Sequence, residues 1–443
     1  MKKNDKYIVD IIDMGMDGEG IAKVDGQIVF VPYAIMGEKV EILIIKTKSK
    51  FAIGKVVNVV DPSPIRIEAQ CPYFSKCGGC DIQHIKYTEQ LKLKKDSLTN
   101  TLKRIGGISH KVQDTISSEN QFNYRNKVAL PVVYQNGATI IGMYRRSTHN
   151  VVEISDCLIQ MPFVKVLLEV TNKYITDNNI MGYVEESGKG LLRHIVARCD
   201  NNNLLVTLVA TSKDLPNLNS YYNELSKHFD NVGLNININN RNTNVIMGSK
   251  TIYVAGIKEL VITENNITYS VPNDSFLQVN NDIRNKIYNY VLDNIDSSDI
   301  IVDLYSGAGV LTSMLSKKAN HVYGIEIVEA AVNSANNLIK NNNINNVTNI
   351  CGDAFVELKK LSTSLNGNYS IVVDPPRKGL GDEVVELLLS TNASKIIYIS
   401  CNPATLSRDL AGLSNKYNIL TITPFDMFPQ TKHLETVVCL SRK

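Results

Sequence analysis

A cysteine and a glutamate near the C-terminal end are the residues best suited to covalent chemistry. Cys401 ends the apolar, β-branched run 395–400 and stands directly before an Asn-Pro helix start. A lone buried cysteine is most often structural, but a helix N-terminus lowers the pKa of a nearby thiol, so we expect a nucleophile at this position. Glu435 precedes the last apolar strand, 436–440, and is the candidate proton acceptor.

Asp374 follows the apolar run 370–373 on a neighbouring predicted strand, in the sequence Asp-Pro-Pro-Arg. The two prolines fix φ and remove two backbone donors, so this turn is rigid and its carboxylate points outward. Related turns hold a flat, polar base in amino-group methyltransferases. Methylation of an amino group on adenine or glutamine is therefore one hypothesis, but it leaves Cys401 and Glu435 without a task.

A glycine-rich turn after the first strand of the C-terminal region is the candidate cofactor site. Gly307 and Gly309 allow the backbone to turn sharply and a ligand to approach it. Thr312 stands where a dinucleotide fingerprint has its third glycine, which argues against NAD. Glu326 ends the next predicted strand, where it can accept two ribose hydroxyls, and Asp353 follows the third strand near the expected adenine edge. These residues fit a nucleoside without a pyrophosphate, and S-adenosylmethionine is the candidate.

Three further cysteines, Cys71, Cys77 and Cys80, lie within ten residues of one another on a loop that contains two glycines. Thiols grouped in this way are typical of a metal site. Three ligands require a fourth, and the spacing alone leaves structural zinc open as the simplest alternative.

Composition limits the class of protein. The chain has 443 residues, 44% hydrophobic and 21% charged, which fits about three folded domains and excludes a disordered or fibrous protein. Eight cysteines are too sparse for a secreted disulfide framework. Since the sequence has neither a signal-peptide core nor a run of about 18 apolar residues, we expect a cytoplasmic protein without a membrane partner.

Charge is distributed unevenly along the chain. There are 47 Lys and Arg against 44 Asp and Glu, a net charge of +3, whereas residues 39–104 contain 13 basic and 6 acidic residues, a local net charge of +7. This N-terminal quarter is suited to contact a polyanion, although a solvated lysine-rich surface has the same composition.

The pattern of predicted elements changes along the chain. Residues 7–60 form five short runs of strand character, which predicts an OB-like barrel. From residue 275 apolar strands alternate with helix-length segments, which predicts a mostly parallel, doubly wound α/β sheet. We therefore expect an N-terminal barrel at 1–61, a central α+β domain with the cysteine cluster at 62–270, and a Rossmann-like methyltransferase domain at 271–443. The predicted strands are 7–12, 20–24, 27–31, 39–46, 51–59, 127–133, 203–209, 300–304, 321–325, 347–351, 370–373, 395–400 and 436–440, and the predicted helix in the central region is 89–104.

Four motifs in combination resemble those of the RNA uracil-5 methyltransferases, and the barrel resembles the TRAM domain that many members carry. The resemblance covers essentially the whole chain. The motifs are Asp303-x3-Gly-x-Gly, Asp374-Pro-Pro-Arg-Lys-Gly-Leu, Ser400-Cys-Asn-Pro-Ala-Thr-Leu-x-Arg-Asp-Leu and Phe428-Pro-Gln-Thr-x-His-x-Glu.

The resemblance implies a class I S-adenosylmethionine-dependent enzyme that methylates carbon 5 of uridine in RNA. Cys401 would add to carbon 6 of the base, and Glu435 would remove the carbon-5 proton. Phe276, in a Phe-x-Gln-Val-Asn segment, is expected to stack on a nucleotide. The cofactor-binding residues that the resemblance implies are Gln278, Tyr305, Gly307, Gly309, Glu326, Asp353 and Asp374.

The resemblance also names a fourth cysteine ligand, Cys157, and implies a 4Fe-4S cluster in place of zinc, with a structural or RNA-docking role. Cys199, Cys351 and Cys439 match no ligand position, so we expect them to be structural.

The expected substrate follows from the domain content. Bacterial transfer-RNA members of the family generally lack both barrel and cluster, whereas ribosomal enzymes with both are familiar, so 23S rRNA is predicted. Methylation of the tRNA T-loop is the alternative, because archaeal-type tRNA members also carry both. A monomer that binds RNA and no DNA is expected. A non-catalytic RNA-binding or ribosome-assembly protein would have lost the nucleophile, the base or the cofactor acid, and all three are present.

Overall fold

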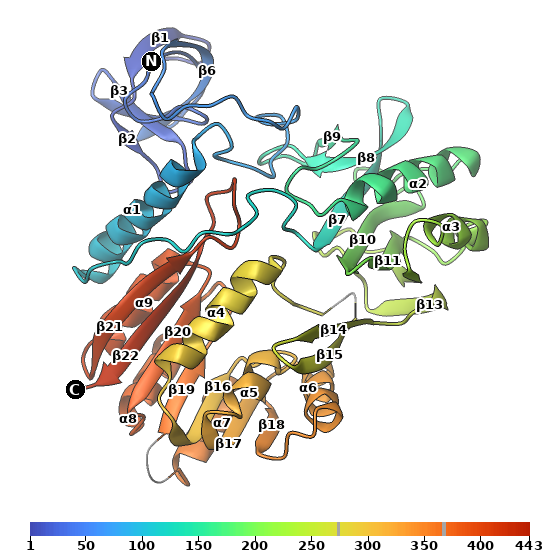
Figure 1. Ribbon diagram of the computed structural model, residues 1–443. Helices are drawn as coiled ribbons and strands as arrows, with labels where there is room; N and C mark the ends of the chain where they lie inside the picture. Colours follow the sequence, from blue (N-terminus) through green and yellow to red (C-terminus); the bar gives the residue numbers. More distant parts are fainter. Residues whose placement is uncertain (273–274, 366–368) are drawn as a thin grey trace.

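Three β-sheets and one β-hairpin set the architecture of the computed structural model, which describes residues 1–272, 275–365 and 369–443 (Figure 1). One sheet lies at the N-terminal end of the chain, one in its middle and one at its C-terminal end. No helix in these described ranges has the length and apolar character that a membrane crossing requires.

The N-terminal sheet has the strand order β1-β5-β6-β4-β3-β2 and curves into a barrel (Figure 1). The amide of Ile12, just after β1, donates to the carbonyl oxygen of Ile21 in β3 and so closes the sheet on itself (2.8 Å). Alternating apolar residues of its strands fill the interior. The predicted barrel is therefore present, with strands β1 (Lys6–Asp10), β2 (Asp13–Met14), β3 (Gly20–Val24), β4 (Gln27–Val31), β5 (Lys39–Thr47) and β6 (Phe51–Asp61).

The central sheet has the order β13-β12-β11-β10-β7-β8-β9 and mixes antiparallel pairs with one parallel pair, β11 and β12. Helices α2 and α3 pack on it and share one large apolar core with its strands. The hairpin of β14 and β15 follows. The elements are β7 (Lys127–Gln135), β8 (Ala138–Tyr144), β9 (Val151–Glu153), α2 (Phe163–Asp177), β10 (Leu192–Asp200), β11 (Asn203–Ala210), α3 (Leu218–Leu225), β12 (Asn231–Ile238), β13 (Lys250–Gly256), β14 (Leu260–Glu264) and β15 (Ile267–Val271).

The C-terminal sheet has the order β18-β17-β16-β19-β20-β22-β21, which is parallel from β18 to β20, while β22 is antiparallel to both of its neighbours. The predicted doubly wound sheet is present, and its functional edge is the one at the carboxyl ends of the parallel strands. The elements are α4 (Asn281–Asn294), β16 (Ser298–Leu304), α5 (Val310–Leu315), β17 (Ala319–Glu326), α6 (Glu329–Asn341), β18 (Val347–Cys351), α7 (Ala354–Ser362), β19 (Tyr369–Val373), α8 (Asp382–Ser390), β20 (Lys395–Ser400), α9 (Pro403–Leu413), β21 (Tyr417–Phe425) and β22 (Glu435–Arg442).

Helix α1 (Tyr87–Gly106) follows the barrel in sequence but packs against the C-terminal sheet (Figure 1). Leu98 and Leu102 are buried in the same apolar cluster as side chains of β16, β19 and α9. Gly106 lies so close to α9 that a Cβ there would be 2.5 Å from the Ser407 carbonyl oxygen. Helix α1 therefore links the barrel and cysteine loop to the catalytic half of the molecule.

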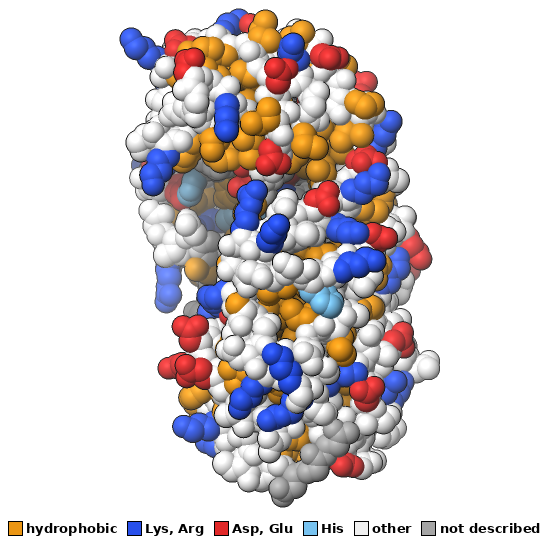
Figure 2. Space-filling model, turned by 90° about the vertical axis from the view of Figure 1, so that its left-hand side faces the viewer, with side chains coloured by type: hydrophobic (Ala, Val, Ile, Leu, Met, Phe, Trp, Pro, Cys, Tyr) orange, Lys and Arg blue, Asp and Glu red, His pale blue; other side chains and the backbone are white. Residues whose placement is uncertain are grey.

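Helix α1 also carries part of the predicted basic region. Lys86, just before it, and Lys92, Lys103 and Arg104 within it are exposed. In Figure 2, Lys and Arg side chains gather across the middle of the face that presents the barrel, α1 and the C-terminal strands. A polyanion bound at this face would lie between the barrel and the C-terminal sheet.

Candidate active site

Cys401 and Glu435 lie opposite each other at the edge of the C-terminal sheet. Cys401 follows β20, and Glu435 is the first residue of β22. These strands pair antiparallel, with Ser400 opposite Thr436, so the next pair toward this end brings Cys401 and Glu435 together. Glu435 is 2% exposed, and its Oε2 atom is buried without a hydrogen-bond partner among the described residues. A buried carboxylate with one free oxygen beside a thiol is suited to remove a proton from a molecule bound between them.

The pKa of Cys401 is raised, whereas the sequence predicted that it would be lowered. Burial, followed by the charges of Glu435 and Asp374, raises the pKa of Cys401 to about 11, and the charge of Arg377 only partly opposes this. The sequence argument that the start of α9 would lower this pKa is therefore wrong for this structure. Folding brings two acids to the thiol, and their effect and that of burial outweigh the helix terminus.

The pKa of Glu435 also differs from that of an ordinary glutamate. Burial, and then the charge of Asp374, raises its pKa well above the usual value, while Arg377 and a hydrogen bond from Gln278 lower it. Arg377 follows the two prolines of the Asp374 turn, and its charge favours the ionised form of both Cys401 and Glu435. The sequence argument quoted Arg377 within a motif without giving it a role.

Two aspartates lie at the ends of adjacent parallel strands. Burial raises the pKa of Asp303 in β16 to about 7, although the Thr312 hydroxyl donates a 2.6 Å hydrogen bond to its Oδ2. Burial, and then the charge of Asp303, raises the pKa of Asp374 to about 7. Thr312, which argued against a dinucleotide, thus fixes the orientation of Asp303.

The predicted cofactor acid Glu326 is oriented by the turn that faces it. The amide of Gly307 donates to its Oε2 (3.0 Å), and the amide of Val328 donates to its Oε1 (2.9 Å). Each carboxylate oxygen retains a lone pair, so the side chain can still accept two hydroxyl groups of a ribose. The carboxylate is thus held at the carboxyl end of β17, where a nucleoside would bind.

The two glycines of the turn have different roles. A Cβ on Gly307 (φ +55°) would meet no atom within 4 Å, so its open side leaves room for a ligand. A Cβ on Gly309 (φ +76°) would lie 2.7 Å from the Cβ of Ala335 in α6, so this glycine serves helix packing. Tyr305 has φ +64°, and the charge of Asp353 contributes to the raised pKa of its hydroxyl, so these two predicted residues are neighbours. Together with Glu326, they form a cradle of the shape and polarity that a nucleoside cofactor needs.

Asp353 also has a structural task. It caps α7, and its Oδ1 accepts hydrogen bonds from the amides of Phe355 (3.0 Å) and Val356 (3.2 Å). Its side chain is exposed, so Oδ2 is accessible to a ligand. The nearby Cys351, expected to be structural, is exposed at the end of β18, whereas Cys199 and Cys439, which were also expected to be structural, are buried.

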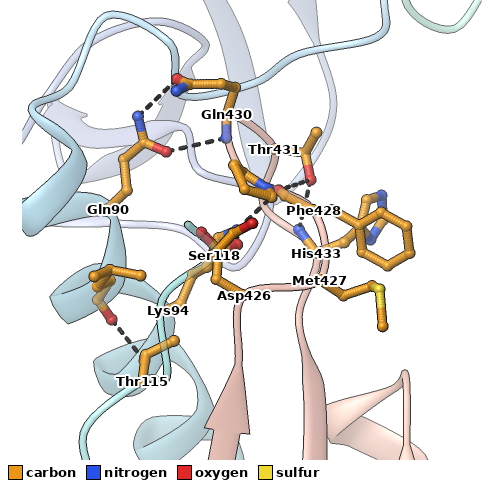
Figure 3. A network of polar contacts seen from close by, with 12 residues as sticks. Gln90, Lys94, Thr115, Ser118, Asp426, Met427, Phe428, Gln430, Thr431 and His433 are labelled. Carbon is orange, nitrogen blue, oxygen red and sulfur yellow. Dashed lines mark hydrogen bonds and ion pairs between the residues drawn. The ribbon is translucent and has the colours of Figure 1, made fainter. Parts of the chain in front are cut away.

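The segment before Glu435 is held by buried side chains from α1 (Figure 3). Lys94 donates to Asp426 Oδ1 (2.5 Å) and to the Phe428 carbonyl oxygen (3.0 Å). The Gln90 Nε2 atom donates to Gln430 Oε1 (2.9 Å), and the Gln430 amide donates back to Gln90 Oε1 (3.1 Å). Residues 426–434 form no strand hydrogen bonds of their own. These contacts therefore determine the position of Glu435 at the start of β22.

The segment 275–280 supplies two further predicted residues. Phe276 is 79% exposed, as a residue that stacks on a nucleotide must be. Gln278 points to Glu435, which accepts its hydrogen bond. The structure therefore places Gln278 beside Glu435, and its expected position at the border of the cofactor stays a prediction.

The four predicted metal ligands, Cys71, Cys77, Cys80 and Cys157, line one cavity of about 270 Å³. All four are free thiols. Burial, and then the charge of Cys157, raises the pKa of Cys80 well above its ordinary value, so these two thiols are close enough to interact. In the described ranges, however, no three His, Cys, Asp or Glu side chains form a group that could hold a metal ion.

Asp409 in α9 is a positioning residue that sequence reasoning did not single out. Its Oδ2 accepts hydrogen bonds from the Tyr398 hydroxyl (2.7 Å) and the Leu380 amide (2.8 Å), and Asn402 Nδ2 donates to the Arg377 carbonyl oxygen (3.0 Å). The start of α9 thus holds the loop after Asp374. The Arg-Asp pair in the Cys401 motif was the available signal.

Comparisons with known proteins bear on both parts of the chain. A family model described as tRNA (Uracil-5-)-methyltransferase matches residues 86–443, and a TRAM domain model matches residues 2–57. An uncharacterized RNA methyltransferase of Clostridium acetobutylicum is 38% identical and covers 100% of this chain and 98% of its own length. One from Staphylococcus aureus strain MSSA476 is 34% identical over 100% of this chain and 99% of its own.

A solved structure has the same arrangement of domains. It is the Pyrococcus abyssi tRNA (uracil-54, C5)-methyltransferase in complex with S-adenosyl-L-homocysteine, which is 25% identical, with a TM-score of 0.79 over 98% of this chain and 99% of that chain. The likeness spans barrel, central sheet and C-terminal sheet alike.

Proposed function

Because the chain belongs to the tRNA (uracil-5-)-methyltransferase family and is an S-adenosylmethionine-dependent RNA methyltransferase with a TRAM domain, we propose that it methylates carbon 5 of a uridine in structured RNA. The observation that carries the proposal is the pairing of Cys401 with a buried, partly unpaired Glu435 beside the cofactor cradle. The target base must leave its helix to reach this pair.

Cys401 supplies the nucleophile. Carbon 5 of uracil is too weakly nucleophilic to attack a methylsulfonium, but addition of the Cys401 thiolate to carbon 6 converts the ring to an enolate. Carbon 5 then forms a bond to the methyl group of S-adenosylmethionine, and the methyl–sulfur bond breaks with release of S-adenosylhomocysteine. The charge of Arg377 favours the thiolate that this addition needs.

Glu435 completes the reaction. Its carboxylate removes the proton from carbon 5, the electron pair of the broken C–H bond forms the 5,6 double bond, and the Cys401 thiolate is expelled. Gln278 stabilises the ionised carboxylate through its hydrogen bond. Tyr305, Gly307, Glu326, Asp353 and Asp374 are the residues that we propose to hold the cofactor, with Gln278 at its border, whereas Gly309 supports the turn by packing against α6.

Covalent trapping tests these roles. With 5-fluorouridine RNA, which has no proton at carbon 5, the wild type should form a stable adduct and Cys401→Ala should form none. Glu435→Gln should accumulate a methylated adduct on ordinary RNA, because its defect follows methyl transfer. Cys351→Ala, which removes another thiol at a strand end of the same sheet, is the control and should behave like the wild type. An adduct in Cys401→Ala would contradict the mechanism.

For the substrate we propose 23S rRNA, since bacterial members with both a barrel and a cysteine cluster are familiar as ribosomal enzymes. The relatives with full coverage include clostridial and staphylococcal proteins. The alternative is the tRNA T-loop, which the name of the Pyrococcus relative favours. Mapping 5-methyluridine in both RNAs from a deletion strain decides between them, since only the true substrate loses the modification.

For the cysteine cavity we propose a 4Fe-4S cluster held by Cys71, Cys77, Cys80 and Cys157. The four thiols line one shared cavity, which supports a common metal centre, and the resemblance to the family favours a cluster that binds each thiolate at a different iron over a zinc ion. Anaerobically purified protein should show visible absorption and about four iron atoms per chain. Stoichiometric zinc without iron would refute the proposal.

A further inference from the structure

The segment 275–280 carries Phe276 and Gln278 to the active site, although it belongs to no helix or strand. Outside helices and strands, the backbone is held by hydrogen bonds to side chains or to isolated backbone amides. The amide of Asn126 donates to the Val279 carbonyl oxygen (2.9 Å), which fixes one end. The carbonyl groups on the active-site side need other donors.

Two buried arginines supply those donors, and Lys127 Nζ also donates to the Ser275 carbonyl oxygen (3.4 Å). Arg198, in β10 of the central sheet, is 1% exposed and directs its Nη2 atom to the carbonyl oxygens of Ser275 (3.3 Å) and Leu277 (3.5 Å). Arg284, in α4, is 0% exposed and donates from Nη1 to the carbonyl oxygen of Gln278 (3.2 Å). The guanidinium groups thus hold the backbone on both sides of Phe276 and Gln278.

The two arginines differ in how their charges are balanced. Arg284 also donates to the carboxylate of Glu264. Arg198 forms no ion pair with a carboxylate in the described ranges, and its Nε and Nη1 atoms are buried without a hydrogen-bond partner there. Burial, and then the charge of Arg284, lowers the pKa of Arg198 to about 10, while Tyr269 and Asp200 oppose this. Burying a cation of this kind is costly, and the hydrogen bonds that Arg198 donates to the 275–278 backbone offset part of that cost.

We propose that Arg198 is a positioning residue for the proton-removal step, holding the 275–278 backbone so that Gln278 donates to Glu435. This inference rests on the proposed function of the site. It means that β10 of the central sheet, which is far from Cys401 in sequence, helps to set the geometry of the reacting centre. An error of about 1 Å in such a support can cost about 100-fold in rate.

The direction of the pH effect follows from the surroundings of Glu435. Its charged and titratable neighbours are Asp374, Arg377 and Cys401, and Gln278 is the donor that lowers its pKa. If Arg198 no longer holds the 275–278 backbone, the hydrogen bond from Gln278 to Glu435 weakens and the pKa of Glu435 rises. Release of the carbon-5 hydrogen, which needs the carboxylate ionised, should then require a higher pH.

The test is a double-mutant cycle read by release of tritium from carbon-5-labelled uridine. Arg198→Ala should lower kcat about 10- to 100-fold, leave the KM for RNA within about 2-fold, and shift the pH profile to higher pH. In a Gln278→Ala background the same change should cost less than about 3-fold, since the group it positions is gone. Additive losses, or an unshifted pH profile, would overturn the inference.

Two further variants keep the result interpretable. Arg198→Lys preserves a cation, but its shorter side chain does not bring the ammonium group to the position of Nη2, so it should show the same pH shift even if Arg198→Ala fails to fold. Arg193→Lys is the matched control: Arg193 is a buried arginine on the same strand that donates to the Asn239 and Arg241 carbonyl oxygens, and its replacement should leave the pH profile unchanged. Failure of the proposed function would look different, because then the wild type itself would release no tritium.

Discussion

The buried ion pair between α1 and the segment before Glu435 offers a quantitative test of how the active site is supported (Figure 3). Lys94 and Asp426 have side chains 2% and 0% exposed, with Nζ 2.5 Å from Oδ1. Lys94→Met leaves the Asp426 carboxylate buried, and its Oδ2 atom already lacks a partner. An uncompensated buried charge costs about 3–5 kcal/mol, so we expect that loss in the free energy of unfolding.

The compensating variant separates the charge from the packing. In Lys94→Met/Asp426→Asn neither charge remains, and the main loss is the hydrogen bond to the Phe428 carbonyl oxygen, worth about 1 kcal/mol. Lys92→Met is the control on the same helix, because Lys92 forms only an exposed pair with Glu89 and should change stability by about 0.5 kcal/mol or less.

Urea unfolding followed by circular dichroism measures these differences at pH 7. Methyl transfer should also slow, because the loop that leads to Glu435 loses an anchor. A loss below about 1 kcal/mol in Lys94→Met, or a double variant no more stable than the single one, would refute the reasoning.

Three further predictions concern the reacting centre and the cofactor turn. Glu435→Gln removes a charge that raises the pKa of Cys401, so its alkylation by iodoacetamide should become faster at pH 8, and an unchanged rate would contradict the electrostatic account. Gly309→Ala should destabilise the protein by about 2 kcal/mol or more, whereas Gly307→Ala should cost about 1 kcal/mol and mainly weaken S-adenosylmethionine binding, which calorimetry and thermal unfolding distinguish. The pKa of Asp303 is raised to about 7 in the folded protein. Its contribution to stability is therefore fully present below its unfolded pKa and is lost as the pH rises through 7. Asp303→Asn should be more stable than the wild type at pH 8 but not at pH 4.

Most strands of both end sheets were predictable because the local sequence pattern is enough to identify them, but β2 and β21 were not predicted. The predicted strands 20–24, 27–31, 347–351 and 395–400 have the bounds that the structure shows, since each is an apolar or alternating run closed by turn residues. The approach of Cys401 to Glu435 was predicted only through a resemblance. It depends on β22 pairing with β20 in one register, which no local pattern in the sequence specifies.

The properties that sequence reasoning missed arise from contacts between distant segments. The pKa of Cys401 depends on Asp374 and Glu435, which folding brings to it from two other strand ends. The position of α1 was hidden because its apolar face fits either its sequence neighbours or the C-terminal sheet. Arg198 looked like any arginine in a strand, since its partners are backbone carbonyl groups more than seventy residues away.

The loop 426–434 joins these distant parts and explains why a binding domain and a catalytic sheet act as one structure. Lys432 pairs with Asp17 of the barrel (2.5 Å), and its amide donates to Asp81, which follows the cysteine loop (3.2 Å). Three residues later the chain reaches Glu435. The same short loop thus contacts the barrel and places Glu435. A change in the position of the barrel would act on this loop, so RNA binding at the barrel and chemistry at Cys401 depend on one support. A folded RNA that reaches from the barrel to the sheet edge would contact both ends of this support, whereas a free uridine would contact only one.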